Sequence, residues 1–147
     1  MAGTLTLTKS FRFESAHRLA KGYVGKCANI HGHSWNGELT VVVDGTDAFD
    51  MAIDYKHLKD VVKGWEDWLD HRLWLCSTDP LAAALRERPE WDGVVLFTNN
   101  PTSETLAQVL ADQGLASLRA RFGMKVVEVS VTVRETCTTS CTYTARP

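Results

Sequence analysis

The chain has 147 residues, a length that predicts a single domain over 1–147. Hydrophobic residues make up 44% and charged residues 23%, ordinary globular proportions that exclude wholesale disorder. The net charge of −2 argues against a polynucleotide-binding protein, because such proteins carry a basic excess. No apolar run is long enough to cross a bilayer, so we expect no membrane partner.

The beginning of the chain and the cysteines indicate the compartment. Residues 1–10 are polar and lack the apolar stretch of a secretion signal. The four cysteines are Cys27, Cys76, Cys137 and Cys141. A chain of this size builds a core without disulfides, so they fit free thiols in a reducing compartment. We therefore expect a cytoplasmic protein.

Four segments have the alternation or the β-branched content of strands. They are 4–14, 35–44, 94–98 and 125–135. In the last of these, every second residue from Val127 to Val133 is a valine and the residues between them are polar. This pattern predicts a strand with one buried and one solvated face.

Two segments have the apolar period of a helix. The first follows Asp54, a candidate N-cap, and its apolar residues form one stripe up to Leu69. The second begins after Thr102 and extends to Phe122, and a shorter helix is predicted over 80–88. Neighbouring strands at each end of the chain favour a four-stranded antiparallel sheet with the two main helices on one face, an α+β architecture. Because such a sheet has two long unpaired edges, we expect it to assemble through them.

Histidines gather where the first predicted strand ends and the second begins. In His31-Gly32-His33 the two imidazoles point to the same face of an extended chain, so both reach one ion. An antiparallel neighbour would bring His17 opposite this pair. Three imidazoles without a fourth protein ligand describe a catalytic zinc site with an open position. The alternative is a set of partly exposed histidines that bind no metal.

A thiol lies close to these histidines, because Cys27 precedes His31 by four residues. Beside a dication a thiol loses its proton more easily and serves as a base or nucleophile. Alternatively, Cys27 is a fourth ligand of a closed structural site or an inert loop thiol, and spacing does not separate these interpretations. The loop before it has three basic residues, Arg18, Lys21 and Lys26. This loop either binds a polyphosphate or is an ordinary solvated surface.

Two carboxylates have candidate roles. Asp70 precedes His71 at the end of the first main helix, where it either orients this imidazole for acid–base chemistry or leaves it to cap helix carbonyls. Glu135 ends the last strand in register with the valines, on the face expected to be dry. A carboxylate there is either paired within the protein or reserved for a ligand with N–H donors.

These residues form an ordered series of motifs. The series is Phe13-Glu14-Ser15-Ala16-His17-Arg18-Leu19, Cys27-x3-His31-Gly32-His33-Ser34, Ile53-Asp54-Tyr55-x2-Leu58-Lys59, Leu69-Asp70-His71, Asn100-Pro101-Thr102-Ser103-Glu104 and Glu135-Thr136-Cys137-x3-Cys141. It resembles the 6-pyruvoyl-tetrahydropterin synthase family across nearly the whole chain. The short gap between Cys27 and His31, with the motif at the end of the chain, is most similar to the bacterial branch. Its members are 6-carboxy-5,6,7,8-tetrahydropterin synthases of the 7-deazapurine (queuosine) pathway.

The resemblance implies the tunnelling fold (T-fold), in which trimers close a β-barrel and two trimers stack into a homohexamer. It implies one zinc ion per subunit on three histidines, His17, His31 and His33. It implies a catalytic trio assembled across a subunit interface, Cys27, Asp70 and His71. It also implies that the amino-pyrimidine edge of a pterin is bound by Glu135, Thr102 and Ser103.

The implied reaction converts 7,8-dihydroneopterin triphosphate to 6-carboxy-5,6,7,8-tetrahydropterin, with release of acetaldehyde and triphosphate. The nearest alternative is the pyruvoyl-forming synthase, which uses the same substrate but does not release acetaldehyde. An alternative of another class is a non-catalytic zinc- or pterin-binding module. The segment 76–100 is longer than in compact bacterial members, and it either decorates the rim or reshapes the mouth of the site.

Overall fold

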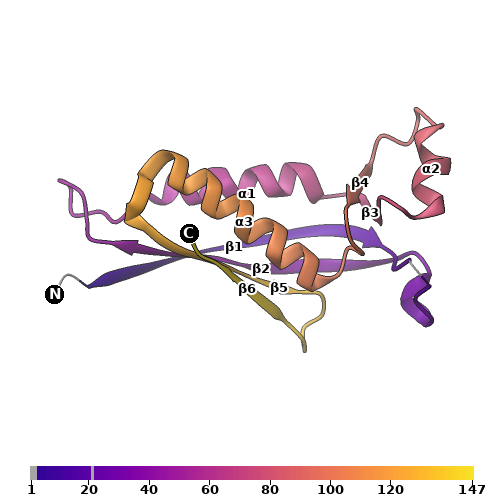
Figure 1. Cartoon of the computed structure of the whole chain (residues 1–147), viewed down its shortest axis with the longest axis horizontal. Coiled ribbons are helices and arrows are strands. Elements are labelled where there is room, and N and C mark those ends of the chain that lie inside the picture. Colours follow the sequence, from indigo (N-terminus) through magenta and orange to yellow (C-terminus); the bar gives the residue numbers. More distant parts are fainter. Residues whose placement is uncertain (1–2, 21) are drawn as a thin grey trace.

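The computed structural model describes residues 3–20 and 22–147, and its centre is one twisted sheet (Figure 1). The elements along the chain are β1 (Thr4–His17), η1 (Lys26–Ala28), β2 (His31–Asp44), α1 (Tyr55–Leu69), β3 (Leu73–Cys76), α2 (Pro80–Arg86), β4 (Val94–Phe97), α3 (Ser103–Phe122), η2 (Gly123–Lys125), β5 (Val126–Arg134) and β6 (Cys141–Ala145). The α+β class is confirmed, and so are the three predicted helices. None of the helices in the described part of the chain has the length and apolarity that a bilayer crossing requires.

The sheet has six strands in the order β4-β3-β1-β2-β5-β6. Antiparallel pairing joins β1 to β2, β2 to β5 and β5 to β6, whereas β3 lies parallel to both β1 and β4. The expected four-stranded antiparallel sheet is therefore wrong. The sequence pattern misses β3 because it is an apolar run of four residues without alternation, and it misses β6 because that strand is short and threonine-rich.

The two longest strands bring the candidate site residues together. β1 and β2 pair over 14 residues each, from Thr4 opposite Asp44 to His17 opposite His31. Because side chains alternate along a strand, His17 lies on the same face of β1 as the buried Phe13. The histidines thus lie at one end of the sheet, on its core side.

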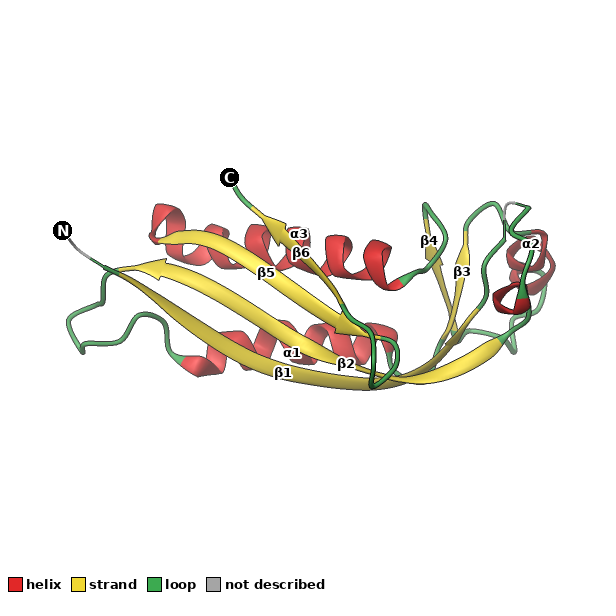
Figure 2. Cartoon of the chain, turned by 90° about the horizontal axis from the view of Figure 1, so that it is seen from below, coloured by secondary structure: helices red, strands yellow, loops and turns green. Residues whose placement is uncertain are grey.

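Both long helices cover the same face of the sheet, and the core lies between them and the strands (Figure 2). The N-cap expected at the start of α1 is present, since the Asp54 side chain accepts a hydrogen bond from Lys56 N at 2.9 Å. Gly114 lets α3 approach the sheet closely, because a Cβ there would lie only 3.3 Å from Val129 Cγ1. The centre of the core holds two fully buried tryptophans, Trp35 and Trp74.

The prediction that every second residue from Val127 to Val133 lies on one buried face is wrong at Val127. Val129, Val131 and Val133 are buried, but Val127 is 40% exposed. The register between β2 and β5 shifts between Val42 and Val43: Val42 lies opposite Glu128, and Val43 lies opposite Val126. Val127 therefore has no partner residue on β2, and Val126 is buried instead of it. Such a bulge inserts one residue and reverses the faces beyond it.

Much of one sheet edge is unpaired in a single chain. β3 pairs with β1 only at Ala16 and His17, so the outer edge of β1 from Thr4 to Phe13 has no partner strand among the described residues. On the other side, β6 pairs only with β5. These edges leave backbone donors and acceptors available for pairing with another chain.

Candidate metal centre and its surroundings

Three imidazoles converge at the end of the sheet where β1 finishes and β2 begins. His17 lies opposite His31 in the ladder, and His33 follows on the same face of β2. The rings of His17 and His33 lie against Trp35, with ring centroids 5.0 and 5.2 Å from the indole. His17 itself is only 2% exposed. The fold thus holds these rings at the boundary between the core and the solvent.

The hydrogen bonds of two rings fix which nitrogen carries the proton. Nδ1 of His17 lies 2.7 Å from the Pro101 carbonyl, and Nδ1 of His31 lies 2.7 Å from the Asn29 carbonyl. A carbonyl only accepts, so both Nδ1 atoms donate and the neutral rings keep a lone pair on Nε2. The two Nε2 atoms are 3.1 Å apart. Two facing lone pairs repel each other unless a cation lies between them, and this orientation of the second ring nitrogen is usual for metal-binding histidines.

A carboxylate completes the cluster. Oε1 of Glu135 lies 3.1 Å from Nε2 of both His17 and His33. The four ligand atoms of His17, His31, His33 and Glu135 all lie within 4.8 Å of one another. Ligands about 2.0–2.1 Å from a tetrahedral zinc are roughly 3.3 Å apart, close to the 3.1 Å that separates His17 from His31 and Glu135 from His17 and His33. The residues therefore fit a metal ion of this kind.

Burial favours the neutral form of two of the imidazoles, those of His17 and His33. Desolvation lowers the pKa of His17 and that of His33, although the Glu135 carboxylate opposes this effect in both. A neutral imidazole is the form that binds a metal, so little proton release is needed at neutral pH.

Glu135 lies differently from the expectation. The sequence predicts that it ends the last strand, but β5 ends at Arg134, and the Glu135 side chain is 30% exposed instead of dry. Its carboxylate contacts two histidines of the metal cluster, which is one of the two alternatives that the sequence left open, whereas the resemblance implies a role in pterin binding. No sequence signal indicates this contact, because it joins residues more than a hundred positions apart.

Cys27 lies beside the metal cluster and is not one of its four donors. Together with His17 and Glu135 it lines a cavity of about 230 Å³. Thr102 and Ser103, at the beginning of α3, line the same cavity. The hydroxyl of Thr102 also caps this helix by accepting from Thr105 N at 3.2 Å. Five of the predicted site residues thus line one cavity, namely His17, Cys27, Thr102, Ser103 and Glu135.

The loop that carries Cys27 is tied to distant parts of the chain. Ala20 N donates to the Asn100 side chain at 2.9 Å, and Leu19 N donates to the Cys27 carbonyl at 2.8 Å. Arg18 pairs with the buried carboxylate of Asp79 at 2.9 Å. Arg18 is thus engaged within the protein, and Lys21 lies outside the described residues. Asp79 is not among the site residues expected from the sequence, and its only local signal is its position before Pro80.

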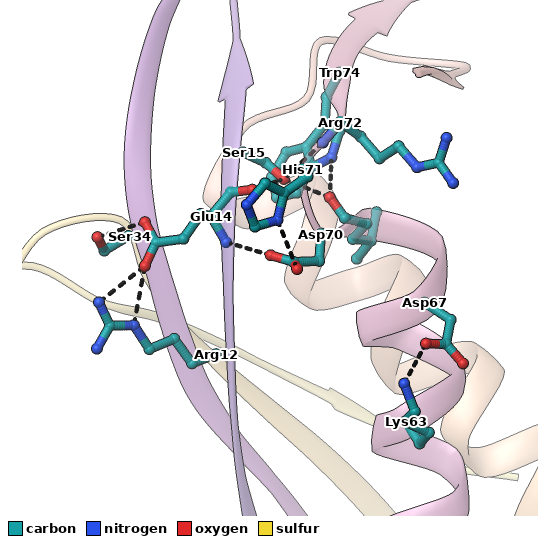
Figure 3. A network of polar contacts seen from close by, with 11 residues as sticks. Arg12, Glu14, Ser15, Ser34, Lys63, Asp67, Asp70, His71, Arg72 and Trp74 are labelled. Carbon is teal, nitrogen blue, oxygen red and sulfur yellow. Dashed lines mark hydrogen bonds and ion pairs between the residues drawn. The ribbon is translucent and has the colours of Figure 1, made fainter. Parts of the chain in front are cut away.

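The Asp70–His71 pair lies at the end of α1, next to the edge of β1 (Figure 3). His71 Nδ1 lies 2.8 Å from Asp70 Oδ2, which is the carboxylate–imidazole pairing that the sequence suggested. The backbone of Glu14 fixes both residues, since its N–H donates to Asp70 Oδ1 at 2.8 Å and its carbonyl accepts from His71 N at 2.7 Å. The bond from Glu14 N is the main reason why the pKa of Asp70 is lowered, and His71 adds to it.

A single chain does not bring this pair to the thiol. Asp70 and His71 are absent from the lining of the cavity that contains Cys27, and the His71 side chain is 80% exposed. Their anchor Glu14 precedes His17 by three residues, roughly 10 Å along an extended strand. His71 also has a φ of 54°, a left-handed conformation that costs a non-glycine residue about 1 kcal/mol or more.

The sheet and the cluster define an α+β protein with a candidate metal centre beside a thiol-lined cavity. The profile of the 6-pyruvoyl tetrahydropterin synthase family matches residues 6–146. A curated relative, the 6-carboxy-5,6,7,8-tetrahydropterin synthase of Aquifex aeolicus, is 32% identical over 156 residues, covering 93% of this chain and 96% of the relative. The probable 6-carboxy-5,6,7,8-tetrahydropterin synthase of Halobacterium salinarum is 35% identical over 130 residues, covering 87% and 79%.

Solved structures agree on the fold. The 6-pyruvoyltetrahydropterin synthase of Plasmodium vivax superimposes with a TM-score of 0.78 at 18% identity, over 99% of both chains. An uncharacterized protein from Wolinella succinogenes gives a TM-score of 0.78 at 21% identity, over 97% of this chain and 98% of the other. The fold is the T-fold, and the chain belongs to the 6-pyruvoyl tetrahydropterin synthase family. It is an enzyme of the lyase class.

Proposed function

We propose that the chain is a zinc-dependent lyase that converts 7,8-dihydroneopterin triphosphate to 6-carboxy-5,6,7,8-tetrahydropterin and releases acetaldehyde and triphosphate. The observation that carries this proposal is the set of imidazoles that turn their Nε2 atoms toward one point beside Cys27. The printed names of the Aquifex and Halobacterium relatives support the carboxy-forming reaction. The product would enter 7-deazapurine (queuosine) biosynthesis, and the four free thiols suit an enzyme of the reducing cytoplasm.

His17, His31 and His33 would hold the zinc ion. When bound, zinc supplies a Lewis acid that polarises the hydroxyl oxygens of the substrate side chain and makes the adjacent C–H protons more acidic. The carbonyl partners of His17 and His31 keep their Nε2 lone pairs directed at this point, and the Trp35 ring packs edge-to-face against the His17 ring.

Cys27 is the proposed base. It lines the cavity with His17 and Glu135 yet lies outside the ligand set, so its sulfur, in the thiolate form, is available to take a proton from carbon and become the thiol. The bonds of its loop to Asn100 and Asp79 hold this position. A thiol in this position is better suited to act as a base than to serve as the fourth ligand of a closed metal site.

His71, oriented by Asp70, would relay the second proton. Asp70 accepts the Nδ1–H of His71, which leaves Nε2 of that ring free to exchange a proton with substrate. Because the pair is exposed and lies away from the cavity in one chain, we propose that it acts on the cavity of a neighbouring subunit.

Two observations support assembly into a hexamer of two stacked trimers, each closing a β-barrel. The unpaired edges of β1 and β6 provide strand partners between subunits. The cavity of about 230 Å³ is also smaller than the ~300 Å³ or more of usual small-molecule sites. A wall from a second subunit would enlarge and complete it.

The pterin ring would bind between the strand ends and the beginning of α3. A carboxylate accepts two parallel N–H bonds, which suits Glu135 for the amino-pyrimidine edge. Thr102 and Ser103 line the same cavity and supply hydroxyls next to that edge.

Incubation with 7,8-dihydroneopterin triphosphate, followed by mass spectrometry of every product, tests the proposal. We expect 6-carboxytetrahydropterin and acetaldehyde in equal amounts. A dominant pyruvoyl product would instead assign the chain to the pyruvoyl-forming synthases. Unchanged substrate, with pterin still bound, would leave a non-catalytic binding module.

A further inference from the structure

The contact between Glu135 and His17 needs a positive charge between the two groups. His17 Nε2 carries a lone pair, because the Nδ1 of that ring donates to Pro101. The Glu135 oxygen at 3.1 Å is also an acceptor, and the same oxygen lies 3.1 Å from His33 Nε2. The contact with His33 is satisfied if Nε2 of that neutral ring carries its proton, but the contact with neutral His17 joins two acceptors. A metal ion held by the three groups removes this conflict.

This geometry adds a ligand exchange at the metal to the proposed function, on which the inference rests. We propose that Glu135 is a fourth, displaceable ligand that closes the metal centre in the absence of a pterin. Three imidazoles and one carboxylate fill the four positions of a tetrahedral zinc, whereas a catalytic site needs one position open. Binding of the pterin ring draws the carboxylate to its N–H groups and thereby opens that position only when the substrate has arrived.

The four donors differ in how firmly the fold holds them. His17, His31 and His33 belong to β1 and β2, and two of the rings are anchored through Nδ1. Glu135 follows the last residue of β5, in a segment without regular structure before β6, and its side chain is 30% exposed. The carboxylate is therefore the donor that leaves at the least structural cost.

The Glu135 carboxylate binds either the metal or the pterin ring, so the metal and the pterin compete for it. If the pterin ring takes Glu135 from the metal, pterin weakens metal binding, and by reciprocity the metal weakens pterin binding by the same factor. Unsubstituted pterin is the suitable probe, because it has the N–H edge but lacks the side-chain hydroxyls that would themselves bind the metal.

The test is zinc affinity, measured by competition with a chromophoric chelator, in the wild type and in two variants. Glu135→Gln removes the ligand charge, and Glu104→Gln removes a carboxylate that lines the same cavity without belonging to the cluster. We expect Glu135→Gln to bind zinc at least tenfold more weakly, a loss within the range for disturbed metal sites, and Glu104→Gln to stay within about threefold of the wild type. Equal affinities of the wild type and Glu135→Gln would overturn the proposal.

A second measurement tests the displacement. Saturating pterin should lower the zinc affinity of the wild type and leave that of Glu135→Gln unchanged. A wild-type affinity that does not respond to bound pterin would contradict the displacement. Pterin binding is followed separately by fluorescence of the zinc-free protein, and its complete absence would contradict the proposed function. The ligand role of Glu135 is decided independently by the comparison made without pterin.

Discussion

The hydroxyl of Ser15 lies beneath the turn that carries the acid–base pair, and its removal should disturb that turn. Ser15 is 7% exposed, its Oγ bonds the Leu69 carbonyl, and it lies 3.4 Å from Arg72 N. These two bonds bracket Asp70 and His71. Because His71 holds a left-handed φ of 54°, its orientation depends on such anchors. We therefore expect Ser15→Ala to lower both stability and turnover.

The structure sets the size of both effects. The Leu69 carbonyl keeps a bond from Trp74 Nε1 at 3.2 Å, so Ser15→Ala leaves no buried acceptor without a donor. Arg72 N loses only a long bond of 3.4 Å, so the cost is close to that of one net hydrogen bond, about 1 kcal/mol. For a chain of 147 residues this corresponds to a Tm lower by about 3 °C. If the same energy is lost in orienting His71 for proton transfer, kcat falls about fivefold with little change in KM.

Thermal unfolding, steady-state kinetics and imidazole ¹⁵N NMR of His71 measure these effects. Ser10→Ala, an exposed site on the same strand, is the matched control and should change none of them. A variant with lower Tm but unchanged kcat and an unchanged His71 spectrum would show that Ser15 only stabilises the fold. An unchanged Tm would refute the hydrogen-bond reasoning itself.

Three further substitutions test other parts of the account. Cys27→Ala should retain zinc and the fold but abolish triphosphate release; loss of the metal would contradict the role of this thiol as a base. Asp79→Ala removes the buried partner of Arg18 and the N-cap of α2, so we expect a loss of about 3 kcal/mol in chemical denaturation. A loss below about 1 kcal/mol would mean that this ion pair contributes little. Gly37→Ala places a Cβ 1.9 Å from the Thr132 carbonyl oxygen, so β2 and β5 must separate locally. We expect little soluble protein from this variant, and a wild-type Tm would refute the close approach.

Local patterns predict those parts of the fold that depend on one segment at a time. The apolar stripe that ends at Leu69 predicts α1, with Asp54 as its N-cap. The H-x-H spacing places His31 and His33 on one face, because the side-chain period of a strand is two residues. These rules do not predict β3, β6 or the position of Val127, because short strands and bulges are determined by the neighbours they pair with.

The contacts of the candidate site likewise divide into those that local spacing predicts and those that depend on distant segments. Sequence spacing brings His17 toward the H-x-H pair only under the assumption of an antiparallel hairpin, which the structure provides. The approach of Glu135 to this cluster and the pairing of Arg18 with Asp79 join segments far apart in the chain. Such contacts depend on the packing of loops against the sheet, which has no local sequence signature. The pairing of Asp70 with a neighbouring residue, in contrast, is visible in the sequence because it is local.

Stepwise return of zinc to metal-free protein, with the product formed at each step, tests the central claim most directly. If His17, His31 and His33 hold one ion that the reaction requires, 6-carboxytetrahydropterin formation rises in proportion to zinc and stops rising at one zinc per chain. His31→Ala should show no such endpoint, because it loses one of the three anchoring imidazoles. Full product formation by the metal-free protein, or zinc binding that never saturates near one per chain, would contradict the account.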